Sequence, residues 1–373
     1  MTTVFIAAGG TGGHIYPGLA IAACLKKRMP DVKIVFIGSH VGMEKNIVPR
    51  YGYPMEFINA SGFQRGFVKK VIAAKNLLKS ARDSRKLLNR YKPALVIGTG
   101  GFTSGIILRE AAKKGIPTLI HEQNAFPGKS NRWAAQKADT VCLTFDEAAK
   151  YFPAKKTVLC GNPVRDAFKN VDRAAMRQKM KLAPGEKMVL AMGGSQGAAA
   201  INRAMQTVMK EWGGREDIQI YQITGPKQID TVCAALDEAG IVYDKEYFGP
   251  THCHAIAYSN EMEMLMGAAD VIIGRSGASS ICEMAASGTP SILIPYPYAA
   301  GDHQRFNAMA MQNAGAAEVI DEDDLSGERL LKELSALLDD PAHLKAMSEN
   351  AKAYAKIDAD ERIVDQAVAL MQQ

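Results

Sequence analysis

The sequence predicts an α/β protein built of two doubly wound domains, and three observations lead to this prediction. Strand-like and helix-like segments alternate along the chain, which is typical of parallel sheets covered by helices on both faces. Two glycine-rich turns, at 9–14 (GGTGGH) and 193–197 (GGSQG), each follow a short apolar run and precede an alanine-rich stretch. The chain has 373 residues, too many for one ordinary core and enough for two domains.

In the first half, short apolar runs predict strands, and longer periodic stretches predict helices. The predicted strands are 3–8, 33–37, 94–98, 117–120, 140–143 and 157–160. The predicted helices are 17–28, 43–51, 67–90, 104–114, 129–137 and 164–170.

The second half repeats the alternation, with helices between its strands. The strands are predicted near 187–192, 218–223, 242–247, 271–273, 290–294 and 317–319. Two closing helices are predicted at 330–338 and from 341 to about 371, and the pattern of the second weakens near 356–360.

The most suitable join between the domains is the segment 160–165 (CGNPVR), where a strand ends in a Gly/Pro break. We therefore expect one domain at 1–162 and another at 163–355. The weakened pattern predicts that the terminal segment, about 356–373, bends and crosses back onto the first domain.

The composition is that of a globular protein, with 47% apolar and 23% charged residues. No apolar stretch reaches the roughly 18–20 residues that span a bilayer, and the N-terminus lacks the pattern of a signal peptide. The six cysteines show no paired spacing. A reduced, cytosolic setting is therefore expected.

The net charge of +6 conceals an asymmetry between the two halves. Residues 1–162 contain 25 Lys and Arg against 9 Asp and Glu, whereas residues 163–373 contain 20 against 30. A basic half beside an acidic half indicates that one domain meets an anionic surface or substrate.

The glycine turns are candidate anion sites, because a strand, a turn and a helix N-terminus present unpaired backbone N–H groups. His14 begins the helix after the first turn, and its ordinary pKa suits a general base. The alternative is a histidine that bonds only locally. No Asp or Glu occurs in this turn, so no carboxylate base is visible there. A third turn, 98–102 (GTGGF), is either a further ligand loop or an ordinary connection.

Polar residues follow several other predicted strands. The segment 121–124 (HEQN) is either a ligand rim or a surface loop. In the second half, 275–278 (RSGA) leads to Glu283, whose carboxylate suits the two hydroxyls of a ribose. The alternative is a favourable interaction of Glu283 with the helix dipole. The segment 302–305 (DHQR) again places polar groups at a strand end.

The segment 63–90 interleaves apolar and basic residues. Such segments bind anionic membrane surfaces, although 71–90 fits equally a solvated helix with its apolar stripe in the core. Nucleic acid is disfavoured as a partner, because no known binding motif is present and the second half is acidic.

The sequence gives little sign of a metal or cofactor. The segment 252–254 (HCH) lacks a second ligand pair at zinc spacing, and the Asp-x-Asp at 358–360 lies in the C-terminal helical tail. About 20 positions past the first glycine turn, no acidic residue follows the second predicted strand, 33–37, which disfavours a dinucleotide-dependent oxidoreductase. We expect neither a chelated metal nor a cofactor.

Taken in order, the blocks at 9–14, 98–102, 122–124, 161–165, 193–197, 275–283 and 303–304 resemble the MurG family. These bacterial enzymes of peptidoglycan synthesis transfer N-acetylglucosamine from its UDP donor to a membrane-bound lipid acceptor. The resemblance covers nearly the whole chain. It implies a GT-B type glycosyltransferase, with two Rossmann-like domains and a cleft between them, and with the donor held mainly by the second domain.

The resemblance also implies the site residues. Ser195 and Arg165 would hold the UDP diphosphate, Glu283 the ribose, the main chain near Ser259 the uracil, and Asn124 and Gln304 the sugar. The implied donor-binding set is Thr11, Gly12, Gly13, Asn124, Arg165, Ser195, Ser259, Ala278, Glu283 and Gln304.

On the acceptor side, the resemblance implies diphosphate-binding loops at Gly10, Gly100 and Gly101, and a membrane patch. The patch residues are Phe63, Arg65, Phe67, Lys69, Lys70 and Lys75. The implied reaction is an inverting displacement in which the muramyl 4-hydroxyl of lipid I attacks the anomeric carbon and UDP leaves, giving lipid II. His14 is our candidate base.

The implied location is the cytoplasmic face of the bacterial cell membrane, with peripheral attachment. The implied partners are UDP-N-acetylglucosamine, the undecaprenyl-linked muramyl-peptide acceptor, the anionic membrane surface, and other cell-wall synthesis and division proteins. Two alternatives stay open: a sugar-nucleotide epimerase of the same fold, and a non-catalytic membrane-binding protein that senses UDP-sugar.

Overall fold

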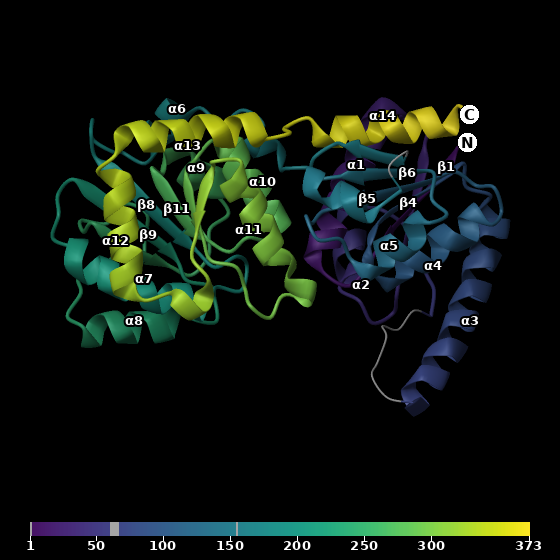
Figure 1. Ribbon diagram of the computed structural model, residues 1–373, viewed down its shortest axis with the longest axis horizontal. Helices are drawn as coiled ribbons and strands as arrows, with labels where there is room; N and C mark the ends of the chain where they lie inside the picture. Colours follow the sequence, from purple (N-terminus) through teal and green to yellow (C-terminus); the bar gives the residue numbers. More distant parts are fainter. Residues whose placement is uncertain (1, 60–66, 154–155) are drawn as a thin grey trace. The chain divides into compact units, whose positions relative to one another are not determined.

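The computed structural model describes residues 2–59, 67–153 and 156–373, and for 67–75 the backbone alone. The chain divides into two compact units (Figure 1). Unit 1 comprises Met1–Val164 and Lys356–Gln373, and unit 2 comprises Arg165–Ala355. The chain thus passes into unit 2 after Val164 and returns to unit 1 at Lys356.

Unit 1 is a parallel sheet with the strand order β3-β2-β1-β4-β5-β6-β7. Its strands are β1 (Thr3–Ala8), β2 (Lys33–Gly38), β3 (Met55–Phe57), β4 (Leu95–Gly100), β5 (Thr118–Glu122), β6 (Thr140–Leu143) and β7 (Thr157–Leu159). Its helices are α1 (Gly12–Arg28), α2 (Glu44–Ile47), α3 (Phe67–Tyr91), α4 (Gly101–Ala112), α5 (Lys129–Ala135) and α14 (Ala359–Met371), with short 3-10 turns at Val48–Tyr51 and Asp146–Tyr151.

The sheet of unit 1 is buried on both faces, as its nearly continuous apolar strands require. Alternate residues of β1 point to opposite sides. Val4 and Ile6 join a core formed with α1 and α14, whereas Phe5 and Ala7 join a core formed with α3, α4 and α5. Both cores are continuous with the buried residues of β2 and β4.

The C-terminal helix α14 completes the first of these cores. Its buried residues Ile363, Val364 and Ala367 pack in the same cluster as the β1 residues. In Figure 1, α14 is the yellow helix beside α1 and next to the sheet. The break before it, after α13 (Pro341–Tyr354), falls where the sequence pattern weakens.

Unit 2 repeats the architecture with the strand order β10-β9-β8-β11-β12-β13, all parallel. Its strands are β8 (Lys187–Met192), β9 (Ile218–Ile223), β10 (Cys253–Ile256), β11 (Val271–Gly274), β12 (Ser291–Leu293) and β13 (Ala317–Val319). Its helices are α6 (Arg173–Lys179), α7 (Ala199–Trp212), α8 (Ile229–Glu238), α9 (Met262–Ala268), α10 (Ala278–Ser287), α11 (His303–Asn313), α12 (Gly327–Leu338) and α13, with 3-10 turns at Asp166–Phe168, Ala300–Asp302 and Glu322–Asp324.

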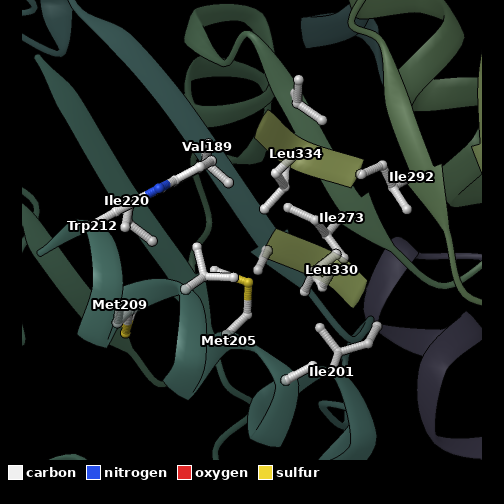
Figure 2. Close-up of a cluster of buried hydrophobic side chains, with 14 of the residues drawn as sticks. Val189, Ile201, Met205, Met209, Trp212, Ile220, Ile273, Ile292, Leu330 and Leu334 are labelled. Carbon is white, nitrogen blue, oxygen red and sulfur yellow. The ribbon is translucent and has the colours of Figure 1, made fainter. Parts of the chain in front are cut away.

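One face of this second sheet carries a core of buried side chains from β8, β9, β11 and β12 and from helices α7 and α12 (Figure 2). Val189 and Ile273, on neighbouring central strands, meet Met205 of α7 and Leu334 of α12 there. All four are essentially inaccessible to solvent. The rigid layer formed in this way supports the loops at the carboxyl ends of β8 and β11.

The structure corrects two sequence predictions and contains two elements that the sequence did not predict. The strand expected at 242–247 is wrong: Asp244 makes only an isolated bridge to His254, and the fully buried Cys253–Ile256 takes the sheet position instead. The helix expected at 164–170 shrinks to the 3-10 turn Asp166–Phe168, because Asp172 caps a separate helix by accepting bonds from the next residues. The short edge strand β3 and the helix α6 were not predicted.

Candidate active site

In each sheet the second and third strands lie on one side of the first strand, and the fourth strand lies on its other side. The glycine turns lie at this switch point. In both units the first strand and the fourth strand are neighbours: β1 lies beside β4, and β8 beside β11. Ligands of such open sheets bind beyond the carboxyl ends of the strands at this switch point. The turn 9–13 follows β1, whereas the segment 98–102 comprises the end of β4 and the start of α4. In unit 2, the turn 193–197 follows β8 and the segment 275–278 follows β11.

Two glycine turns touch each other in unit 1. The Gly9 N–H donates to the Gly100 carbonyl over 3.3 Å. A methyl group on Gly101 would lie 2.5 Å from the Gly9 oxygen, and Gly101 has a φ of +86°. Only glycine fits this close approach. The two turns therefore form one surface at the start of α1 and α4.

His14 is oriented by this surface. Its Nδ1 lies 2.9 Å from the Gly9 carbonyl oxygen. Because a carbonyl only accepts, Nδ1 carries the proton and the Nε2 of the neutral ring holds a lone pair. The Thr99 hydroxyl donates to the His14 carbonyl over 2.7 Å and fixes the backbone as well. The ring therefore has the tautomer that a base acting through Nε2 requires.

A pocket of about 490 Å³ opens beside His14. It is lined by His14, Gly100, Gly101, Phe102, Glu122, Asn124, Gly128, Lys129, Ser130, Asn131 and Trp133. Of the predicted site residues, the pocket thus brings together His14, Gly100, Gly101 and Asn124. Every lining residue belongs to unit 1.

Glu122 organises the loop that carries Asn124. Its side chain is buried and accepts from the backbone N–H of Asn124 (3.0 Å) and of Gly128 (3.1 Å) and from the Asn131 amide (2.9 Å). The Asn124 side-chain amide donates to the same carboxylate over 3.3 Å. Four donors therefore satisfy Glu122 and fix the loop at the pocket wall. The sequence showed Glu122 only as part of a polar run, with no signal of this role.

The neighbours of Glu122 point into the protein instead. His121 is fully buried, donates from Nε2 to the Gly161 carbonyl (3.0 Å), and accepts at Nδ1 from Gln123 (3.0 Å). Burial lowers the pKa of His121 from its ordinary 6.5 to about 4, so the ring is neutral near pH 7. Of the four residues 121–124, only Glu122 and Asn124 line the pocket.

A second carboxylate that the sequence did not associate with this site reaches the first glycine turn. Glu44, on α2, is buried and its Oε2 accepts from the Gly10 N–H over 3.1 Å. The first turn therefore has a carboxylate against it, although no acidic residue occurs within it. Thirty-four positions separate the two residues. The flanking glycines at 38 and 42 were the available clue.

In unit 2, the turn 193–197 is shaped by close backbone approach. Methyl groups on Gly193 and Gly197 would lie 2.1 Å from the Ala198 nitrogen and 2.0 Å from the Thr224 oxygen. The helix α7 follows, with Ala198 as its N-cap and no side chain capping its first N–H groups. Ser195 is exposed on this turn. The arrangement can receive an anion.

Glu283 and Arg165 form an ion pair, with 2.7 Å between Arg165 Nε and Glu283 Oε1. Burial raises the pKa of Glu283 above its ordinary value, although the Arg165 guanidinium opposes the shift. Arg165 therefore contacts the residue expected at the ribose. Phe168 lies under the guanidinium, 4.9 Å from it to the ring centre.

Of the other predicted donor residues, Ala278, Ser259 and Gln304 lie in unit 2. Ala278 is the first residue of α10. Ser259 follows β10, is buried, and accepts from the Glu261 N–H over 3.0 Å. Gln304, in the first turn of α11, accepts from the Tyr296 N–H over 3.0 Å. Thr11, Gly12 and Gly13 belong to unit 1, at the start of α1.

The segment 252–254 is engaged inside unit 2. The His254 ring stacks on Tyr221 with 4.2 Å between the ring centres, and its two nitrogens contact the Glu246 carbonyl and the Gln219 side chain. His252 accepts from the same Gln219. These contacts join the edge strand β10 to Gln219 and Tyr221 of the neighbouring strand β9.

The predicted membrane patch cannot be followed in the structure. Phe63 and Arg65 lie outside the described residues. Phe67, Lys69, Lys70 and Lys75 lie in α3, in the part for which the backbone alone is described. Across the described portion of the chain, every helix is too short or too polar to cross a bilayer.

Comparison with known families matches both units. Residues 4–143 match the glycosyltransferase family 28 N-terminal domain, and residues 188–363 match the family 28 C-terminal domain. Two curated relatives are named UDP-N-acetylglucosamine–N-acetylmuramyl-(pentapeptide) pyrophosphoryl-undecaprenol N-acetylglucosamine transferase. That of Desulforudis audaxviator is 41% identical over 97% of this chain and 96% of its own length. That of Bacillus licheniformis is 38% identical over 96% of both.

Solved structures agree. Acinetobacter baumannii MurG superposes with a TM-score of 0.82 at 27% identity, covering 99% of this chain and 100% of that one. A UDP-GlcNAc 2-epimerase from Neisseria meningitidis has a TM-score of 0.67 over 99% of this chain and 100% of its own, but its 13% identity shows a shared fold alone. The chain therefore belongs to glycosyltransferase family 28 and, within it, to the MurG family.

Proposed function

We propose that this protein transfers N-acetylglucosamine from UDP-N-acetylglucosamine to the muramyl 4-hydroxyl of N-acetylmuramyl-(pentapeptide) pyrophosphoryl-undecaprenol, converting lipid I to lipid II. The observation that carries the proposal is the orientation of His14. Its Nδ1 donates to the Gly9 carbonyl, and its ring borders a pocket large enough for a sugar. The names of the relatives supply the substrates.

In this reaction His14 Nε2 accepts the proton of the attacking hydroxyl while the oxygen bonds to the anomeric carbon. The configuration inverts, and UDP leaves with the electrons of the broken bond. A positioned base of this kind contributes about 10²- to 10⁴-fold to the rate. The polar wall at Asn124, kept in place by Glu122, contacts the sugar hydroxyls.

Unit 2 holds the donor. The uncapped N-terminus of α7 and Ser195 bind the diphosphate and stabilise the charge that develops as UDP departs. Glu283, paired with Arg165, accepts from the ribose hydroxyls. Ser259, Ala278 and Gln304 complete the uracil and sugar contacts, with Thr11, Gly12 and Gly13 supplied by unit 1.

On the acceptor side, Gly100 and Gly101 present the N-terminus of α4 to the lipid-linked diphosphate. We place the protein at the cytoplasmic face of the cell membrane, attached peripherally through the patch formed by Phe63, Arg65, Phe67, Lys69, Lys70 and Lys75. Roles in cell shape and division, with other cell-wall synthesis proteins as partners, follow from the same reaction.

The test is UDP release by the purified protein with UDP-N-acetylglucosamine and a lipid-linked muramyl acceptor. We expect release that depends on the acceptor and falls by about 10²- to 10⁴-fold in His14→Ala. Absence of UDP release by the wild-type protein would contradict the proposal. Epimerised sugar nucleotide formed without acceptor would indicate the epimerase alternative, and tight donor binding without turnover would indicate a sensor.

A further inference from the structure

Glu44 contacts the first glycine turn from a separate element of unit 1. Its side chain is entirely buried, and its two oxygens receive three donors. Oε1 accepts from the Ser39 N–H (2.8 Å) and the Ser39 hydroxyl (3.0 Å), and Oε2 accepts from the Gly10 N–H (3.1 Å). Because every partner donates, the group is satisfied as an ionised carboxylate.

The chain leaves room for this carboxylate by having glycine at two neighbouring positions. A methyl group on Gly42 would lie 1.9 Å from Glu44 Oε2, and one on Gly38 would lie 2.6 Å from Glu44 Cγ. Side chains at either position would expel the carboxylate from its place. The space around Glu44 is therefore shaped to hold it against the turn.

The contact reaches His14 through two residues of backbone. Glu44 fixes the N–H of Gly10, which adopts a φ of +92°, and so fixes the peptide that begins with the Gly9 carbonyl. That carbonyl is the acceptor for His14 Nδ1. If the peptide rotates, the acceptor turns away and the imidazole loses the bond that selects its tautomer.

We propose that Glu44 is a positioning residue: by binding the Gly10 N–H, it holds the Gly9 carbonyl where it orients His14 with a free Nε2. The kinetic part of this inference rests on the proposed function, whereas the structural part does not. The Glu44 contact also makes the glycine turn before α1 chemically different from the glycine turn before α7. The N–H of Gly10 is occupied by an internal anion and is closed to a substrate phosphate, in contrast to the turn before α7.

Glu44→Gln is the sharpest variant, because it is isosteric and has one acceptor in place of two. Its amide oxygen is expected to take the Oε1 position, where two donors converge, which leaves the NH₂ group facing the Gly10 N–H. Gly42→Ala provides an independent route, since the added methyl displaces Oε2 while Glu44 stays in the sequence.

Two matched controls separate this role from general destabilisation. Ser39→Ala removes one donor to Oε1 and leaves the Gly10 contact intact. Gly214→Ala adds a methyl in unit 2, where nothing lies within 4 Å. Circular dichroism and urea unfolding report whether each variant is folded.

The decisive readout is the tautomer of His14, measured by NMR of ring-labelled histidine at about pH 8.5, where histidine side chains are ordinarily neutral, with the signal assigned from His14→Gln. The wild-type protein and both controls are expected to show Nδ1–H. Glu44→Gln and Gly42→Ala are expected to shift toward the mixed tautomers of an unconstrained imidazole. Their kcat should fall by about 10- to 100-fold, as for a misplaced catalytic group, with donor KM within twofold of wild type.

An unchanged His14 tautomer in both folded variants would overturn the inference, and so would kcat values within twofold of wild type in an active enzyme. If the wild-type protein proves inactive but the tautomer shifts as expected, the positioning role stands and the proposed function fails. The two conclusions are therefore tested separately.

Discussion

At the scale of single residues, the segment 121–124 shows how a polar run divides its tasks. Successive residues of an extended strand point to opposite faces. Glu122 therefore turns to the pocket wall and His121 turns into the protein, where Gln123 reaches back to it. The same composition in a surface loop would leave all of these groups in water. Side-chain direction, which depends on the sheet, decides which of them can meet a ligand.

Glu283 yields the first prediction at this scale. Glu283→Ala should raise the KM for UDP-N-acetylglucosamine by about 10- to 100-fold, because hydrogen bonds to a charged group contribute about 1.5–3 kcal/mol. The acceptor KM should change little. Steady-state kinetics with each substrate varied in turn measures both. Glu349→Ala, an exposed position on α13, is the control, and an equal rise in both KM values would contradict the assignment.

His121 yields a prediction on pH. Its pKa is about 4 in the folded protein against 6.5 ordinarily, so between these values the unfolded chain binds more protons. The free energy of unfolding of unit 1 should therefore fall as the pH drops from 6.5 to 4, by about 3 kcal/mol from this residue. Urea denaturation across this range should show a shallower fall in His121→Gln.

Residue-scale predictability from sequence was limited by such long-range contacts. His14 could be proposed because it directly follows a glycine turn. Asn124 lies in a polar run after a predicted strand, and its role came from the resemblance to the MurG family. Glu44 could not be connected with Gly10, since the contact depends on how α2 packs on the sheet. The pairing of Arg165 with Glu283 likewise spans 118 positions.

At the scale of elements, the strands were easier to predict than the helices that begin at glycine. Continuous apolar runs identified β1, β8 and β11, because strands buried on both faces have no polar side. The helices α1 and α4 begin at Gly12 and Gly101, earlier than predicted. The predicted starts were later because glycine has a low intrinsic helix propensity. The close contact of the two turns overrides that preference.

The helix α3 carries the membrane prediction. Replacing Lys69, Lys70 and Lys75 together by alanine should weaken binding to vesicles that contain anionic lipid by roughly 100-fold, since each such lysine contributes about 1 kcal/mol. The loss should be greater at low salt. Cosedimentation measures it. Replacing three exposed lysines of unit 2 instead, Lys210, Lys227 and Lys245, is the control, and unchanged binding of the α3 variant would remove the argument for a membrane patch.

At the scale of the whole molecule, the chain crosses between units twice, and both crossings border one tight contact in unit 1. Gly161 has a φ of +93°, and a methyl group there would lie 2.4 Å from Lys356 Cβ. The Gly161 carbonyl is also the acceptor for His121. Gly161 therefore holds the outgoing segment, the returning segment and β5 together.

Gly161→Ala should destabilise unit 1 by about 1–3 kcal/mol more than Gly52→Ala, as expected for overpacking. Gly52 belongs to the same unit and has a φ of +77° but nothing within 4 Å, so it controls for backbone strain alone. Urea unfolding followed by circular dichroism compares the two. Equal destabilisation would show that Lys356 moves away from the added methyl group at little cost in free energy.

The fold class could be predicted because the alternation of strands and helices and the two glycine turns repeat along the chain. The two sheet orders could not, since β3 has only three residues and Cys253–Ile256 is too short to stand out beside the charged stretch before it. Pairing in the sheet, and not local propensity, selected both strands.

The position of α14 has a consequence for synthesis on the ribosome. Unit 1 needs Ile363, Val364 and Ala367 to complete a core whose other strands and helices are translated before unit 2 begins. Unit 2 contains all of its own elements. During translation, unit 2 can therefore reach its final structure first, while the N-terminal unit stays incomplete until the last helix leaves the exit tunnel.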